Sequence, residues 1–233
     1  MKKIGIIGAM EEEIKRLKDK MEKVKISNIA AMDFYEGNLN NASVVVVRSG
    51  IGKVNAAICT QILVDRFGID LVINTGVAGS LRNEIDIADI VLSTDALQHD
   101  MDATGFGYKV GEIPQMKKSV FEADKYLIDL AEKVCKENLP NVGVHKGRIV
   151  SGDQFISDAD KKEWLLKTFD GYCTEMEGAA IAQAAYLNNI PFLIIRAISD
   201  KADHSAEMAF NEFEAIAIDN SVKLLTELIK RID

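Results

Sequence analysis

The stretch Gly178–Ile195, GAAIAQAAYLNNIPFLII, contains no charged residue. Asn188, Asn189 and Pro191 interrupt it, so it is too broken for a membrane span of about 20 apolar residues. The apolar run Phe192–Ile195 that follows the interruption is typical of a strand covered on both faces. The stretch therefore predicts a buried helix, a turn and a buried strand in an α/β protein.

Working outward, apolar β-branched runs alternate with helical patterns along the whole chain. Strands are predicted at Lys3–Ile7, Ser43–Arg48, Leu71–Asn74, Ile90–Thr94, Val144–Val150 and Phe192–Ile198. Helices are predicted at Glu11–Glu22, Val54–Phe67, Asp124–Glu137, Asp158–Thr168, Met176–Leu187 and Asn211–Ile232. Asn40-Asn41 between two strand-like runs in Phe34–Val47 indicates a hairpin. The alternation predicts a largely parallel sheet covered by helices.

Length and composition narrow the class of protein. A chain of 233 residues with 48% hydrophobic residues suits one folded domain, which we expect to span residues 1–233. The net charge of −8 argues against a protein that binds nucleic-acid phosphates. The odd number of cysteines, at Cys59, Cys135 and Cys173, gives no disulfide framework and favours a reducing, cytoplasmic setting.

Three common ligand-binding motifs are incomplete or absent in this sequence. Gly5-x-x-Gly8 lacks the G-x-G-x-x-G spacing of a dinucleotide-binding turn, and Gly50–Lys53 lacks the first glycine and the final Ser or Thr of a phosphate loop. No two of the three histidines have a metal-ligand spacing. We therefore expect neither a metal nor an organic cofactor.

Carboxylates at the ends of predicted strands carry the first chemical signal. Glu11–Glu13 follow the first strand, Glu175 and Glu177 precede an almost uncharged helix, and Asp200 ends the most hydrophobic strand. Open α/β sheets place ligands at such strand ends. Each acid alone is also explained by a helix N-terminus, which favours negative charge. Together with glycine-rich turns at Ser49–Gly52 and Thr75–Ser80, they indicate an enzyme using acid–base chemistry on a small polar ligand.

A series of segments carries a more specific resemblance. In order, they are Ile4–Glu13 (IGIIGAMEEE), Ser49–Lys53 (SGIGK), Asn74–Gly79 (NTGVAG), Ser151–Ile156 (SGDQFI), Glu175–Glu177 (EME) and Arg196–Asp200 (RAISD). The series closely resembles the 5′-methylthioadenosine/S-adenosylhomocysteine nucleosidases of the nucleoside phosphorylase superfamily, over essentially the whole chain. The resemblance implies a single-domain, three-layer α/β/α fold with a central twisted, mixed, mostly parallel sheet. Val77 departs from the family, where Ser is common.

The resemblance also implies an activity and its residues. The activity is hydrolysis of the N-glycosidic bond of methylthioadenosine and adenosylhomocysteine, which releases adenine and the thioribose in methionine salvage and methyl-cycle recycling. Asp200 would be the general acid at adenine N7, with a raised pKa, and Glu13 would activate water. The substrate-binding residues implied are Met10, Ile51, Val77, Ala78, Gly79, Phe155, Ile156, Glu175, Met176, Glu177, Arg196, Ser199 and Phe210, with Phe106 closing the pocket of the partner in a homodimer.

The residues themselves leave two other functions to be weighed. A purine nucleoside phosphorylase would share the fold but needs cations or backbone donors for phosphate, whereas Glu11–Glu13 and Asn74-Thr75 stand in the relevant turns. Repulsion between like charges about 4 Å apart is ~1 kcal/mol in water and larger in a dry site, which favours neutral water as nucleophile. A non-catalytic nucleoside-binding protein would be expected to lack one of Glu13, Glu177 and Asp200, and all three are present.

Overall fold

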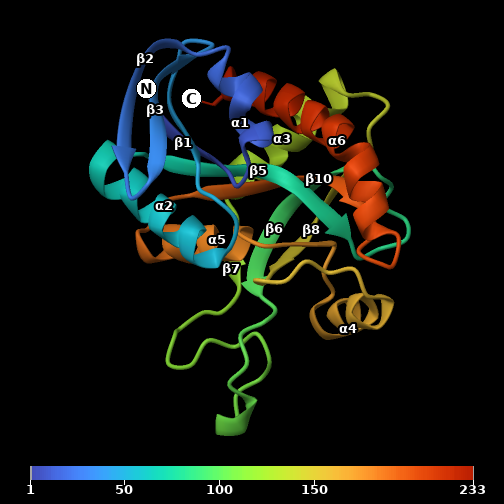
Figure 1. The fold of residues 1–233 in the computed structure, drawn as a ribbon. Coiled ribbons are helices and arrows are strands. Elements are labelled where there is room, and N and C mark those ends of the chain that lie inside the picture. Colours follow the sequence, from blue (N-terminus) through green and yellow to red (C-terminus); the bar gives the residue numbers. More distant parts are fainter. Residues whose placement is uncertain (1, 233) are drawn as a thin grey trace.

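The fold of residues 2–232 is described by a computed structural model, in which ten strands form one mixed sheet with helices around it (Figure 1). The strands are β1 Lys3–Gly8, β2 Glu22–Ile29, β3 Met32–Leu39, β4 Ala42–Arg48, β5 Leu71–Ser80, β6 Ile90–Gln98, β7 Phe121–Glu122, β8 Val144–Ser151, β9 Cys173–Glu175 and β10 Phe192–Asp200. The helices are α1 Glu11–Lys18, α2 Lys53–Phe67, η1 Thr104–Phe106, α3 Lys125–Asn138, α4 Ala159–Phe169, α5 Gly178–Leu187 and α6 Ala206–Ile229.

Helices cover both faces of the sheet. In β4, Val44 and Val46 point into a core shared with α1, α3 and α6, while Val45 and Val47 point into a second core shared with α2 and α5. This alternation has the period of two that a strand imposes, and it makes the sheet the middle of three layers. Figure 1 shows the same arrangement, with α1, α3 and α6 on one side and α2 and α5 on the other. The predicted three-layer α/β/α class is confirmed.

The sheet closes on itself at one end. Parallel pairs join β4, β1, β5 and β10 in that order, and β10 also pairs with β6. The neighbours β6, β8, β9 and β5 complete a ring of five strands. No pattern in the sequence indicated this closure, which arises because β5 is long enough to pair with β1 near its start and with β9 at Gly79 and Ser80. The carboxyl ends of β1, β5 and β10 therefore come together beside β9.

Most predicted elements lie where the patterns put them. The hairpin at Asn40-Asn41 is confirmed, since both residues have positive φ, 51° and 68°, as a tight turn between β3 and β4 requires. The predicted helix at 11–22 ends earlier, at Lys18, because the chain enters β2. β2 has no buried face to reveal it, since most of its residues are exposed. Among the described residues, no helix is long and apolar enough to cross a membrane.

Candidate active site

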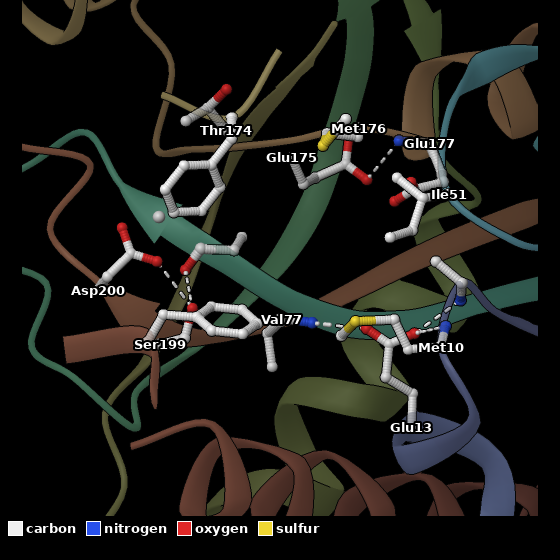
Figure 2. Close-up of a pocket in the computed structure, with 15 residues that line it drawn as sticks. Met10, Glu13, Ile51, Val77, Thr174, Glu175, Met176, Glu177, Ser199 and Asp200 are labelled. Carbon is white, nitrogen blue, oxygen red and sulfur yellow. Dashed lines mark hydrogen bonds between the residues drawn. The ribbon is translucent and has the colours of Figure 1, made fainter. Parts of the chain in front are cut away.

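A cavity of about 300 Å³ opens at the carboxyl ends of β1, β5 and β10. That volume is at the lower end of the range of small-molecule pockets, roughly 300–1,000 Å³. Figure 2 shows Asp200 and Ser199 toward one end and Glu13 and Met10 toward the other. The lining residues are Ala9, Met10, Glu13, Ile51, Val77, Ala78, Gly79, Phe155, Thr174, Glu175, Met176, Glu177, Ser199, Asp200 and Phe210.

Glu13 occupies one end of the cavity and is held by backbone donors. Its Oε2 accepts hydrogen bonds from the N–H groups of Ala9 at 2.6 Å and Met10 at 2.9 Å, which closes the N-terminus of α1. Its Oε1 accepts from the Val77 N–H at 3.3 Å, so position 77 contributes through its backbone. Burial raises the pKa of Glu13, while the nearby Arg196 guanidinium and these N–H groups oppose the rise.

Asp200 lies at the other end of the cavity, at the last position of β10. Its Oδ2 accepts from the Ser199 hydroxyl at 2.8 Å, and its Oδ1 accepts from the Ala202 N–H at 2.7 Å. The residue is 2% exposed. Burial raises the pKa of Asp200 above the usual aspartate value, and the two hydrogen bonds oppose the rise only in part. Such a carboxyl group is suited to carrying a proton.

Two glycines of β5 make room for these two carboxyl groups. A Cβ atom at position 76 would lie 2.5 Å from Glu13 Oε1, and one at position 79 would lie 2.7 Å from Asp200 Oδ1. Both distances are far below ordinary contact. The glycines of the NTGVAG segment are therefore required by the side chains that pack against them, one for each end of the cavity.

Glu177 projects from the start of α5 beside Ile51 (Figure 2). Its Oε1 accepts from the Gly52 N–H at 2.8 Å. Burial and the neighbouring Glu175 raise the pKa of Glu177 to about 8, against the pull of Arg196. The site thus holds a third carboxyl group whose charge is costly because the group is buried.

Arg196 is the buried cation behind these acids, and it is 2% exposed. Its Nη2 donates to Glu175 and to the Asn74 side-chain oxygen. The ion pair with Arg196 and several hydrogen bonds keep the pKa of Glu175 below the usual glutamate value despite burial. No hydrogen bond from Arg196 to Glu177 is found among the described residues, so its effect on Glu177 is electrostatic.

Four other predicted residues are aromatic or aliphatic, and they lie in three different places. The rings of Phe155 and Phe210 meet edge to face, 6.3 Å apart, on the cavity wall. Ile156 lines a small adjoining cavity that shares Phe155 and Asp200. Phe106 is 88% exposed on the long connection between β6 and β7 and does not line the cavity of its own chain. This connection projects away from the body of the molecule in Figure 1.

Four residues of the site were not singled out from the sequence. Ala9 and Thr174 line the cavity, while Asn74 and Ser151 contact Arg196 and Glu175 behind it. Asn74 and Ser151 stand in segments already picked out, NTGVAG and SGDQFI, but their side-chain partners are distant in the chain. Among residues 2–232, no group of three or more His, Cys, Asp and Glu side chains is arranged to hold a metal ion.

Comparison with known proteins places this geometry in a family. The family model described as the phosphorylase superfamily matches residues 3–230. A 5′-methylthioadenosine/S-adenosylhomocysteine nucleosidase from an Exiguobacterium species is 46% identical, over 99% of both chains. The corresponding nucleosidase of Neisseria meningitidis, solved with methylthio-immucillin-A, is 40% identical, covers 100% of both chains and has a TM-score of 0.95.

A third relative was solved with a smaller ligand. The methylthioadenosine/adenosylhomocysteine nucleosidase of Colwellia psychrerythraea, in complex with adenine, is 38% identical, with a TM-score of 0.93 over 98% of this chain and 94% of that one. Identity at this level over nearly full length confirms the resemblance drawn from the six sequence segments. The chain belongs to the phosphorylase superfamily and, within it, to the family of 5′-methylthioadenosine/S-adenosylhomocysteine nucleosidases.

Proposed function

We propose that this protein hydrolyses the N-glycosidic bond of 5′-methylthioadenosine and S-adenosylhomocysteine and releases adenine. The observation that carries the proposal is a cavity with a buried acid of raised pKa, Asp200, at one end and a backbone-held carboxylate, Glu13, at the other. The family relationship supplies the substrate class. The two edge-to-face phenylalanines, Phe155 and Phe210, offer aromatic surface for a base and an apolar wall for a thioalkyl group.

In this proposal Asp200 serves the leaving base. Cleavage of the glycosidic bond leaves negative charge on adenine and positive charge on the sugar. A proton delivered to adenine N7 neutralises the departing base, and the raised pKa of Asp200 keeps that proton available. The Ser199 hydroxyl and the Ala202 N–H, which donate to Oδ2 and Oδ1, together fix the orientation of the Asp200 carboxyl group.

Glu13 serves the attacking water. Its two oxygens are oriented by Ala9, Met10 and Val77, which leaves little freedom for the carboxylate to turn away. An ionised Glu13 accepts a proton from water and stabilises the oxocarbenium-like sugar by charge. Glu177 would accept hydrogen bonds from the ribose hydroxyls, and Met176 would pack beneath the ring.

The charge of the cavity favours water over phosphate. In the described part of the chain, no Lys or Arg lines the cavity, and Arg196 behind it is already paired with Glu175. Arg48 is exposed at the end of β4, and Lys53 is paired with Asp100. A phosphate dianion would therefore be repelled by the ionised Glu13 and would find no free cation among the described residues of the cavity wall to offset that repulsion.

Adenine release from methylthioadenosine in the presence and absence of phosphate tests the reaction. We expect equal rates and free methylthioribose as the product, because water needs no added nucleophile. A strict requirement for phosphate, with a sugar 1-phosphate product, would make the protein a phosphorylase. Binding without adenine release under either condition would make it a nucleoside-binding protein.

We also propose that the active unit is a homodimer in which Phe106 of each chain closes the pocket of the other. Exposed apolar side chains support this: Ile51 is 54% exposed, Val54 69%, Ile58 43% and Leu187 60%, at the cavity rim and on the packed helices α2 and α5. Phe106, at 88%, would otherwise leave a large aromatic surface in water. A shared pocket gives the long connection between β6 and β7 a role.

A mixing experiment tests the shared pocket. Phe106→Ala alone should lower kcat/KM by about tenfold or more, since burial of a phenylalanine contributes roughly 1.5–3 kcal/mol. Mixed with an inactive Asp200→Asn chain, it should regain activity, because the hybrid dimer holds one site with Asp200 from one chain and Phe106 from the other. The absence of recovery in a sample shown to contain hybrid dimers would assign Phe106 a role outside the partner's pocket.

The wider setting is proposed on the same basis. We place the protein in the cytoplasm, in methionine salvage and the recycling of adenosylhomocysteine, as one domain over residues 1–233. The three cysteines are free and buried, which is compatible with a reducing compartment. The family model spans residues 3–230 as one unit, which supports a single domain.

A further inference from the structure

At the start of α5, the glutamate at the N-cap position does not cap the helix. Glu177 is the N-cap residue of this helix, yet its side chain makes no capping hydrogen bond. Its carboxyl group instead lines the cavity and accepts from the Gly52 N–H. An acid at the N-cap normally satisfies the first free N–H groups of its own helix. Something else must therefore satisfy them here.

Glu175, two residues earlier, takes that place. Its Oε2 accepts from the N–H of Glu177 at 3.1 Å, as Figure 2 shows, and from the N–H of Gly178 at 2.7 Å. Position 178 is a glycine, and a Cβ atom there would lie 3.1 and 3.2 Å from the two carboxylate oxygens of Glu175. The carboxylate of Glu175 therefore sits directly over the first turn of α5, where the helix dipole favours negative charge.

Ser151, the last residue of β8, locks Glu175 in this position. Its hydroxyl donates to Glu175 Oε1, and its oxygen accepts from the Ala179 N–H at 2.7 Å. Ser151 is 0% exposed. The Ser151 side chain thus links the end of β8 to the Glu175 carboxylate on β9 and to the Ala179 N–H in the first turn of α5.

We propose that Ser151 and Glu175 are positioning residues, which together cap α5 in place of Glu177 and so leave the Glu177 carboxyl group free to face the substrate. This assignment rests on the proposed function, in which Glu177 binds the ribose hydroxyls. It moves Glu175 from the residues that touch substrate to those that act through another residue. With the capping carboxylate displaced, Glu177 would turn toward its own helix.

Charge adds a second reason for the exchange. Glu177 faces Glu175 on β9, Arg196 on β10 and Glu13 on α1. Because Arg196 forms its ion pair with Glu175, the capping carboxylate has a buried counter-ion, whereas no cation of the described residues is in direct contact with Glu177. Glu175 is thus held at the helix by its ion pair. Glu177, at the cavity, remains available to new hydrogen-bond donors.

The test is the dependence of catalysis on the ribose hydroxyls. For the wild type and Ser151→Ala, kcat/KM is measured with methylthioadenosine and with its 2′-deoxy and 3′-deoxy analogues. Removing a hydroxyl leaves the buried Glu177 carboxyl group without its partner, which costs roughly 1–3 kcal/mol, so the wild type should prefer the parent nucleoside by ~5- to 150-fold over at least one analogue. We expect Ser151→Ala to reduce the preference for the parent nucleoside to within a few-fold of that shown by Glu177→Ala. In the double variant, Ser151→Ala should not change the preference of Glu177→Ala any further.

Ser93→Ala is the matched control. Ser93 is also 0% exposed, and its hydroxyl oxygen accepts from the Ile194 N–H at 3.0 Å, away from the cavity. Its hydroxyl preference should stay at the wild-type value even if stability falls. Should Ser151→Ala not fold, Ser151→Cys, with a weakly donating thiol, should give an intermediate preference.

The outcomes separate the two proposals. If the wild type releases no adenine, the proposed function fails. If it does, the positioning role is overturned by any of three results: no hydroxyl preference in the wild type, an unchanged preference in Ser151→Ala, or an equal loss in Ser93→Ala.

Discussion

Asp200→Asn is expected to lower kcat by about 10²- to 10⁴-fold, the usual contribution of a positioned general acid. Asparagine keeps the size of the side chain, and its single oxygen can accept from the Ala202 N–H while its NH2 group donates to the Ser199 oxygen, but it has no acidic proton to give to adenine N7. Substrate binding should persist. Single-turnover kinetics and direct binding of methylthioadenosine measure the two effects separately.

The pH profile gives Asp200 a second signature. Because its pKa is raised, the acid stays protonated to higher pH than an ordinary aspartate, and activity should decline as pH rises through the folded-state pKa. This limb should be absent from the residual activity of Asp200→Asn. Asp124→Asn is the control, since Asp124 caps α3 through the Leu127 N–H and asparagine caps equally well. A near-normal rate in Asp200→Asn would remove Asp200 from the role of acid.

Glu13→Gln should have the second large effect, a loss of roughly 10²-fold or more in kcat from removal of the general base. Glutamine preserves the capping of α1, because it can also accept from the Met10 N–H at this third position of the helix. The variant should therefore fold normally, which thermal unfolding would verify.

The acid side of the pH profile should report Glu13. As pH falls below its raised pKa, Glu13 takes up a proton and can no longer accept one from water, so the wild-type rate should fall there. Glu13→Gln should lack this dependence. Glu12→Gln, an exposed neighbour in the first turn of α1, is the matched control and should keep the wild-type profile. Loss of the acid limb in Glu12→Gln instead would assign the titration elsewhere.

Much of the fold could be predicted because its signals are local. The buried strands are apolar on both faces, as in Val44–Val47, and the turn at Asn40-Asn41 needs two residues that tolerate positive φ. β2 could not be predicted, since an exposed edge strand has no buried face to pattern. Closure of β5, β10, β6, β8 and β9 into a ring depends on pairings between distant segments, which no single stretch specifies.

The candidate site divides in the same way. Glu13, Glu177 and Asp200 stand out because each follows or ends a strand, and the family resemblance assigns their chemistry. The structure brings all three to one cavity. The roles of Ser151 and Asn74 could not be predicted, because a buried hydroxyl or amide gains its meaning only from partners such as Glu175 and Arg196, 24 and 122 residues away. The effect of Phe106 depends on a second chain and stays a prediction.

Gly76 and Gly79 of β5 limit the substitutions that this protein can accept during evolution. A side chain at Gly76 or Gly79 would collide with the carboxyl group it faces, so neither glycine is free to vary while its acid is kept. A mutational path to another leaving group or nucleophile would have to pass through an intermediate that has already lost an acid. A library that varies Gly76 together with Glu13, or Gly79 together with Asp200, should therefore contain functional sequences that saturation of single positions cannot reach.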